Sequence, residues 1–307
     1  MQRIQQVGLP VRAALGASGL HVGLCDIGPE QLHDPFLQET VKRVPARQSL
    51  LAIPKAELGH APPGSAPAGV ILHVGRCGST LISQLLKQHD GVVVYSEPAP
   101  FNEVLVPPHR AERGELVAAL RSLGALFSRH AGKPYLLKLT SWNTLYCDLV
   151  AEAFPSTPWA LSVRDPVEVC VSFLRHRPGW LRDEQLFASV IDPSRSSRGP
   201  EDHVARLYGA LCNAAGRLDP ARGKLVPYEA LPDAVWNVLG PHFGLSIDDR
   251  LRVRMAAASK TYSKSPVGRA TPFVPDEANK RAAASAELHQ AIDTHARPAL
   301  SRLAAKF

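Results

Sequence analysis

Val70-Ile-Leu-His-Val-Gly-Arg-Cys-Gly-Ser-Thr-Leu-Ile-Ser-Gln-Leu-Leu86 is the stretch that decides the fold of this 307-residue chain. It opens with an apolar run of strand length that ends at Val74. Gly75 and Gly78 follow, and apolar residues then recur at helical spacing from Leu81 to Leu86. The stretch therefore predicts a strand, a glycine-containing turn and a helix.

The predicted turn from Gly75 to Thr80 is a candidate anion site. The first N–H groups of a helix are unpaired and lie at the positive end of its dipole, which suits a phosphate group. The turn is not a Walker A loop, because GxxxxGK[ST] needs a lysine after its second glycine. Here Ser79 follows Gly78, and the cation, Arg76, precedes it. We therefore expect neither ATP hydrolysis nor ordinary phosphoryl transfer, and a βα turn without a ligand remains the alternative.

The chain beyond this stretch alternates between strand-length apolar runs and helical patterns. Such alternation predicts βαβ units, and hence an α/β fold whose central parallel β-sheet is covered by helices on both faces. The C-terminal part is predicted to be helical, with a polar, proline-containing loop at 262–272. The expected strands are 70–74, 92–95, 135–139, 159–163 and 224–227, and the expected helices are 115–130, 142–153, 166–176, 201–217, 230–243, 248–259 and 276–305.

The N-terminal part has a different character. Residues 1–50 contain scattered prolines and predict short helices and turns, and the proline- and glycine-rich residues 60–69 predict a linker. We expect an N-terminal extension, 1–66, that packs on the core, and a main domain, 67–307, which comprises a nucleotide core at about 68–230 and a helical cap with a nucleotide-closing loop at 231–307.

Composition narrows the class of protein. Hydrophobic residues make up 45% and charged residues 21% of the chain, which excludes global disorder. The net charge of +7 suits an anionic partner: nucleic acid, an acidic surface or a phosphorylated nucleotide. No nucleic-acid motif accompanies the short basic run Arg175-His-Arg177, so we expect no nucleic-acid partner. No apolar run reaches the length of about 18 residues that a membrane-spanning helix needs.

Cysteine and histidine spacing bears on redox state and metals. The five cysteines contain no CxxC pair, which speaks against a disulfide framework or a zinc site and favours a cytoplasmic protein. The histidines form neither HxxxH nor HExxH, so no metal site is expected.

Two further segments place cations at predicted strand ends. Arg164 follows the strand at 159–163, and Ser172 lies eight residues later in the helix that Pro166 begins. Lys138 lies at the end of the strand at 135–139. Because the carboxyl ends of parallel strands share one edge of a sheet, we expect Arg164 and Lys138 to lie near the glycine turn.

These segments together resemble the sulfotransferases that use 3′-phosphoadenosine 5′-phosphosulfate (PAPS). Arg76-Cys-Gly-Ser-Thr80 is similar to the family's 5′-phosphosulfate loop, [PR]-[KR]-[ST]-G-[ST]-T, although Gly75 replaces the usual proline and Cys77 the usual Ser or Thr. Arg164 with Ser172 resembles the 3′-phosphate pair, and Val226-Pro-Tyr-Glu-Ala-Leu231 resembles the family's Tyr-Glu-x-Leu segment. The resemblance covers roughly residues 68–275 and implies a P-loop-like, three-layer fold. It implies nucleotide-binding roles for Arg76, Cys77, Gly78, Ser79, Thr80, Arg164, Ser172, Tyr228 and, in the closing loop, Ser263 and Lys264.

The resemblance also indicates a branch of the family. Cytosolic small-molecule members carry a catalytic histidine in a Lys-x-His run, whereas this chain has Lys138-Leu-Thr140. Tyr95-Ser-Glu-Pro98 instead puts Glu97 where it resembles the base of the tyrosylprotein enzymes, nearer the Glu-based, carbohydrate-type and bacterial branch. Glu97 is then the general base, while Lys138 and Arg76 stabilise the departing phosphate.

The implied reaction moves a sulfuryl group in line from PAPS to a hydroxyl acceptor and releases PAP, with no metal. The acceptor class stays open among a small molecule, a sugar, a lipid and a peptide tyrosine, and residues 1–66 and 177–200 are expected to shape its pocket. A non-catalytic nucleotide-binding protein and a divergent P-loop kinase are the alternative functions.

Each assigned residue has a structural alternative. Glu97 could pair with Arg76 or cap a helix, and Lys138 could be a surface charge at a strand end. Arg164 could form a salt bridge with Asp165 or Glu168 instead of binding phosphate. The loop at 262–272 could be solvated and without a ligand.

Overall fold

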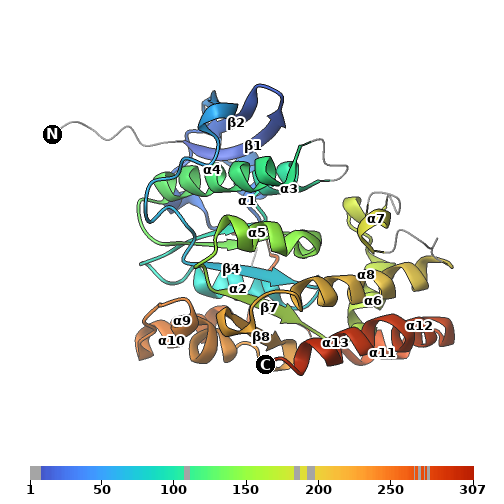
Figure 1. Ribbon diagram of the computed structural model, residues 1–307. Coiled ribbons are helices and arrows are strands. Elements are labelled where there is room, and N and C mark those ends of the chain that lie inside the picture. Colours follow the sequence, from blue (N-terminus) through green and yellow to red (C-terminus); the bar gives the residue numbers. More distant parts are fainter. Residues whose placement is uncertain are drawn as a thin grey trace.

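Figure 1 shows the computed structural model, which describes residues 8–106, 111–182, 187–191, 198–265, 267–268, 271–272, 274 and 277–307. Its centre is a five-stranded parallel sheet in the order β5-β6-β4-β7-β8. The strands are β4 (Gly69–His73), β5 (Val93–Ser96), β6 (Tyr135–Lys138), β7 (Trp159–Val163) and β8 (Gly223–Pro227). The α/β class with a parallel sheet is confirmed, and each end of the expected strands lies within one residue of the observed end.

Alternate residues of the strands enter two separate cores. In β4, Val70 and Leu72 pack in one core, while Ile71 packs in the other. The strands are therefore apolar on both faces, as expected of a parallel sheet covered by helices. Because β4 lies in the middle, the turn after it is flanked by strand ends on both sides.

Helices cover both faces of the sheet (Figure 1). The face of Ile71 packs against α2 (Ser79–Leu86), α10 (Asp249–Ala258) and the residues around α9 (Gly240–His242). The other face carries the larger core and packs against α3 (Ala99–Leu105), α4 (Arg113–Ala131), α5 (Cys147–Ala153), α6 (Pro166–Arg175), α8 (Pro200–Ala215), α12 (Ala286–Ala291) and α13 (Arg297–Ala304). Two short helices, α7 (Ala188–Ile191) and α11 (Glu277–Ala282), complete the described part of this side. No helix in the described ranges is both long enough and apolar enough to cross a bilayer.

The prediction for residues 1–50 is largely wrong. Three antiparallel strands form a second sheet, β1 (Leu9–Gly16), β2 (Gly19–Cys25) and β3 (Gln48–Pro54). Within the described residues 8–50, α1 (Leu37–Arg43) is the one α-helix. Gly16 ends β1 and Gly19 begins β2. Gly16 pairs with Gly19 across a tight hairpin, where a left-handed or extended backbone is needed.

Two expected C-terminal helices are less regular than predicted. The segment at 230–243 contains a π-helical turn at Val235–Leu239 before α9, and the segment at 276–305 is divided into α11, α12, a π-helical turn at Ile292–Ala296, and α13. Helical periodicity in the sequence does not distinguish these local changes in hydrogen bonding from a continuous α-helix.

A candidate nucleotide site at the carboxyl edge of the sheet

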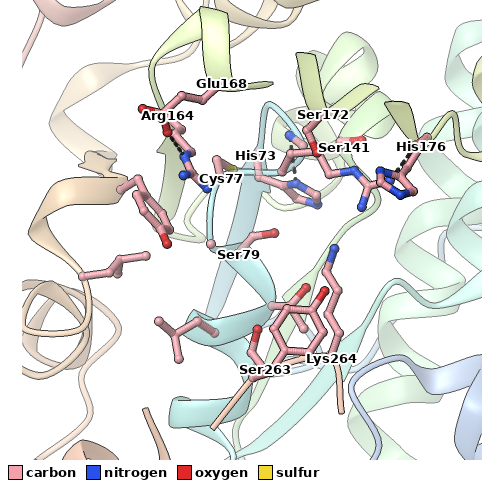
Figure 2. A pocket seen from close by; sticks show the side chains of 18 of the residues that line it. His73, Cys77, Ser79, Ser141, Arg164, Glu168, Ser172, His176, Ser263 and Lys264 are labelled. Carbon is pink, nitrogen blue, oxygen red and sulfur yellow. Dashed lines mark hydrogen bonds and ion pairs between the residues drawn. The ribbon is translucent and has the colours of Figure 1, made fainter. Parts of the chain in front are cut away.

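A cavity of about 1000 Å³ lies at the carboxyl edge of the parallel sheet. All the residues to which the sequence assigned a role line this one cavity, although they come from the ends of five strands and from the late loop. They are Arg76, Cys77, Gly78, Ser79, Thr80, Glu97, Lys138, Arg164, Ser172, Tyr228, Ser263 and Lys264. Figure 2 shows the side chains of several of them converging on the space. The shared strand edge therefore assembles these residues, whereas their roles stay proposals.

The turn after β4 is shaped for close approach of a ligand. Gly78 begins α2 in a left-handed conformation, with φ of 82°. A Cβ atom at Gly78 would come within 2.6 Å of the Leu231 side chain, so a larger residue would need a rearrangement. Gly78, Ser79 and Thr80 all line the cavity, at the end of α2 where the first N–H groups of a helix are unpaired.

Cys77 anchors this turn to the neighbouring strand. Its Sγ donates to the carbonyl oxygen of Ser162 at 3.1 Å, and Ser162 Oγ donates to the carbonyl oxygen of Cys77 at 2.7 Å. Burial raises the pKa of the Cys77 thiol, so the group stays protonated. Because this side chain points into the protein, Cys77 can offer a ligand its backbone only.

Arg76 occupies the left-handed region, with φ of 52°, which is uncommon for a residue that has a Cβ atom. Its Nη2 donates to the carbonyl oxygen of His176 at 2.7 Å. The guanidinium thus lies at the rim of the cavity and is held by the segment that follows α6.

Glu97 and Lys138 form an ion pair between two neighbouring strand ends. Lys138 Nζ donates to Glu97 Oε1, and the Glu97 N–H donates to the carbonyl oxygen of Lys138 at 2.6 Å. Lys138 is 0% exposed, so it is not a surface charge. Glu97 pairs with Lys138 rather than with Arg76. Glu97 also has a positive φ, 53°, and its Oε2 has no partner among the described residues.

A second charged group lies at the end of β7. Arg164 Nε donates to Glu168 Oε2 at 2.5 Å, so the alternative salt bridge to Glu168 does exist. The Arg164 guanidinium also lies over the ring of Tyr228, 3.9 Å from its centroid. Arg281 donates to Glu168 Oε1 at 2.8 Å, and Lys280 also lines the cavity. Two arginines therefore pair with one buried carboxylate at the end of β7.

Lys264 enters the cavity from the late loop (Figure 2). Burial, together with the positive charges of Arg76 and Lys138, lowers its pKa to about 8. Lys264 therefore loses its proton more easily than an ordinary lysine, and an anion bound nearby would favour the charged form.

Several lining residues had not been identified from the sequence. Lys280 and Arg281 were given no role, although two adjacent basic residues in a predicted helical segment were a usable signal. Glu168 was named from the sequence only as an alternative partner of Arg164, and not as part of the cavity lining. His73 was overlooked because it lies within the apolar run of β4.

Residues 1–66 and 177–200 were expected to shape the acceptor pocket, and described residues from both segments line the cavity. Phe36, from the N-terminal part, lines the cavity, and its ring centroid lies 5.2 Å from Lys138 Nζ. Pro178 and Trp180 line it as well. Among the described residues, no group of three or more His, Cys, Asp or Glu side chains is placed to hold a metal ion.

Comparisons with known proteins gave structural neighbours only. No family model matches the chain, and no curated protein matches it in sequence. Among solved structures, the sulfotransferase domain of the Synechococcus PCC 7002 olefin synthase is 17% identical, with a TM-score of 0.45 over 76% of this chain and 97% of that chain. A sulfotransferase from Alicyclobacillus acidocaldarius is 16% identical, with a TM-score of 0.44 over 78% of this chain and 95% of that chain. A mouse sulfotransferase complexed with PAP is 12% identical, with a TM-score of 0.37 over 66% of this chain and 67% of that chain. The chain is thus similar in structure, at low identity, to bacterial and mammalian sulfotransferases.

Proposed function

We propose that this protein is a PAPS-dependent sulfotransferase of the glutamate-based branch, which transfers a sulfuryl group to a hydroxyl acceptor. One observation carries the proposal. The turn at 75–80, called the phosphate loop from here on, lines a single cavity together with the buried Lys138–Glu97 pair and Arg164. The sequence motifs supply the choice of nucleotide, because their order and spacing resemble the PAPS-binding segments of that family.

The residues present suit a nucleotide that carries phosphate groups at both ends. The helix start at Ser79 and the cations Arg76 and Lys264 would hold the 5′-phosphosulfate. Arg164 and Ser172 would hold the 3′-phosphate, and a guanidinium can bind a phosphate bidentately, which an ammonium cannot. The missing side chain at Gly78 lets Leu231 and Tyr228, which also line the cavity, pack against the start of α2.

Glu97 would act as the general base. Its Oε1 is held by Lys138, which leaves Oε2 to accept the proton of the acceptor hydroxyl. Thr140 lies where the histidine-based branch has its imidazole, and a hydroxyl group is no base near neutral pH. Since Lys138 is buried, the pair fixes the orientation of the carboxylate before the acceptor arrives.

PAPS, when bound, supplies an activated sulfuryl group whose transfer leaves negative charge on the 5′-phosphate. Arg76, Lys264 and the N-terminus of α2 would stabilise that charge from the protein side. In other enzymes the loss of one such donor costs about 3–4 kcal/mol of barrier. The acceptor would approach from the part of the cavity that Glu97 and Phe36 line, both of them close to Lys138 Nζ.

A thermal-shift comparison tests the nucleotide assignment. The protein is heated with PAP, with ATP plus Mg²⁺ and with an oligonucleotide, each with and without EDTA. We expect PAP to stabilise the fold most, and a ligand at one hundred times its Kd adds about 2.7 kcal/mol. A larger shift with ATP plus Mg²⁺ would support the kinase alternative, and loss of the PAP shift in EDTA would contradict metal-independent binding.

Turnover is then measured by mass spectrometry with PAPS and a panel of phenols, sugars, lipid alcohols and tyrosine peptides. A sulfate ester formed together with PAP is the expected product. PAP binding without any product across the panel would favour the non-catalytic nucleotide-binding alternative.

A further inference from the structure

His73 ends β4 and makes two hydrogen bonds with its buried imidazole. The Gly75 N–H donates to Nδ1 at 3.1 Å, and Nε2 lies 2.9 Å from the carbonyl oxygen of Leu139. A backbone N–H only donates and a carbonyl only accepts, so the ring must carry its proton on Nε2. Backbone groups therefore occupy both ring nitrogens. The imidazole has no lone pair left with which to take a proton from a substrate hydroxyl.

One hydrogen-bond partner of His73 lies in the turn proposed to bind phosphate, and the other lies next to the proposed catalytic pair. Gly75 opens the phosphate loop, in the left-handed region with φ of 84°. Leu139 directly follows Lys138, and Glu97 Oε1 lies 3.9 Å from His73 Nε2. Figure 2 shows the imidazole at the edge of the cavity, beside the loop that carries Cys77. One side chain thus connects the phosphate loop to the strand end that carries the Lys138–Glu97 pair.

We propose that His73 is a positioning residue: its neutral imidazole fixes the phosphate loop relative to Lys138 and Glu97. This inference rests on the proposed function, since it gives those groups their roles. It also implies that the Gly75 N–H is used internally, so phosphate binding begins with the later N–H groups of the turn.

The surroundings of the ring keep it neutral. Burial and the positive charges of Lys138 and Lys264 lower the pKa of His73 well below its usual value. Glu97 Oε1 lies 3.9 Å from its Nε2, and that carboxylate already pairs with Lys138. An imidazole that stays neutral near pH 7 keeps the same two hydrogen bonds when the pH changes around that value.

Two substitutions separate the two hydrogen bonds. In His73→Asn, the amide oxygen can replace Nδ1 and keep the Gly75 bond, but the shorter side chain does not reach Leu139. In His73→Gln, the terminal NH₂ can replace Nε2 and keep the Leu139 bond, while the acceptor for Gly75 is lost. An unsatisfied buried partner costs enough free energy to change an equilibrium or a rate by about tenfold.

PAP affinity is measured by calorimetry, and kcat under PAPS saturation. We expect His73→Gln to raise the PAP Kd about tenfold, because the phosphate loop loosens. We expect His73→Asn to keep the PAP Kd within about threefold and to lower kcat about tenfold, because the Lys138–Glu97 pair shifts.

His130 offers a matched control. It is a buried histidine outside the cavity, with ring nitrogens 2.6 Å from the Tyr95 hydroxyl and 2.7 Å from the carbonyl oxygen of Ile27. His130→Asn and His130→Gln should lower the Tm but leave the PAP Kd and kcat within about twofold. Equal effects of the His73 and His130 variants on Kd and kcat would overturn the positioning role.

Two further results would also overturn it. One is a loss of 10²-fold or more in kcat in both His73 variants, with an unchanged PAP Kd and a missing limb in the pH profile, since that pattern identifies a base. The other comes from ¹⁵N NMR of the wild-type protein, which needs no variant: a His73 ring that titrates between about pH 6 and 8 contradicts the neutral Nε2–H form. If the wild-type protein does not bind PAP, the proposed function fails, while the NMR result still decides the state of His73.

Discussion

Glu97 and Lys138 form an ion pair, but their side chains differ in exposure to solvent. The Lys138 side chain is 1% exposed, whereas Glu97 keeps 24% of its side chain exposed toward the cavity. An unpaired ammonium at this depth would be costly, so Glu97 offsets the burial of Lys138 while remaining accessible itself. The buried lysine thus holds an accessible carboxylate in a fixed position.

Replacing this carboxylate tests the base. In Glu97→Gln we expect kcat to fall by about 10²–10⁴, the usual range for removal of a general base. The PAP Kd should change little, because Glu97 lies on the acceptor side. Calorimetry with PAP and pre-steady-state rates with PAPS check both expectations, and a Tm measurement shows whether Lys138 still tolerates its burial.

Glu115→Gln is the matched control for that variant, because Glu115 is also paired with a lysine, Lys55, but lies outside the cavity. It should leave kcat unchanged. A Glu97→Gln protein that turns over within about threefold of wild type, with chemistry rate-limiting, would contradict the assignment of the base.

Arg164 is expected to act in nucleotide binding rather than in the transfer itself. In Arg164→Ala we expect the KM for PAPS to rise with kcat nearly unchanged, because a contact equal in ground and transition states affects binding only. Glu168 keeps Arg281 as a partner in this variant, so the fold should survive. Arg164→Lys should also weaken binding, since a lysine cannot pair with Glu168 and bind phosphate bidentately at once. Unaltered PAP affinity in a folded Arg164→Ala protein would refute the role.

Lys264 predicts a pH dependence of PAP binding. With a pKa of about 8 in the free protein, Lys264 is charged below pH 8 and neutral above it. A bound phosphate group favours the charged form, so the pKa rises on binding and protons are taken up near pH 8. The PAP Kd should therefore be flat from about pH 7 to 8 and increase above pH 8, by up to about tenfold per pH unit.

Calorimetry in buffers of different ionisation enthalpy measures this proton uptake. Lys264→Met should abolish the uptake and weaken binding at pH 7, whereas Lys260→Met, just outside the cavity lining, should do neither. Proton uptake that persists in Lys264→Met would assign the titration to another group.

Phe36 should influence the acceptor and not the nucleotide. Its ring centroid lies 5.2 Å from Lys138 Nζ, the group that pairs with Glu97. In Phe36→Ala we expect the acceptor KM to rise several-fold with the PAP Kd within about twofold. Leu50→Ala, at a residue 74% exposed in the N-terminal sheet, is the control. A changed PAP Kd in Phe36→Ala would mean that the N-terminal part contacts the nucleotide instead.

The central sheet was predictable because β4, β5, β6 and β7 are short, mostly apolar runs that are bounded by turns and buried throughout. The edge strand β8 is partly exposed. The grouping of Arg76, Lys138 and Arg164 was predictable for a related reason, since each follows a parallel strand and such strands end at one edge. What could not be predicted was which residues pair. The order β5-β6-β4 puts Glu97 beside Lys138, with Arg76 one strand farther away. The order of strands in a sheet cannot be deduced from the sequence of each strand alone.

The N-terminal sheet was missed for a different physical reason. Its strands are half-exposed, so their signal is alternation rather than an apolar run, and Gly19 and Gly23 lack side chains that would reveal the alternation. The two bonds of His73 were equally hidden, because a histidine inside an apolar run gives no sign of which backbone groups it will meet.

The backbone at Arg76 and Glu97 has a consequence for engineering. Both residues adopt a left-handed conformation in which a residue with a Cβ atom is less stable than glycine by about 1–2 kcal/mol. A search for stabilising substitutions guided by backbone preference alone would therefore favour glycine at these two positions. At Arg76, where the side chain makes a single hydrogen bond to His176, such a variant would gain robustness and lose a cation that the proposed reaction needs. Thermal stability and catalytic rate are thus expected to move in opposite directions at this turn.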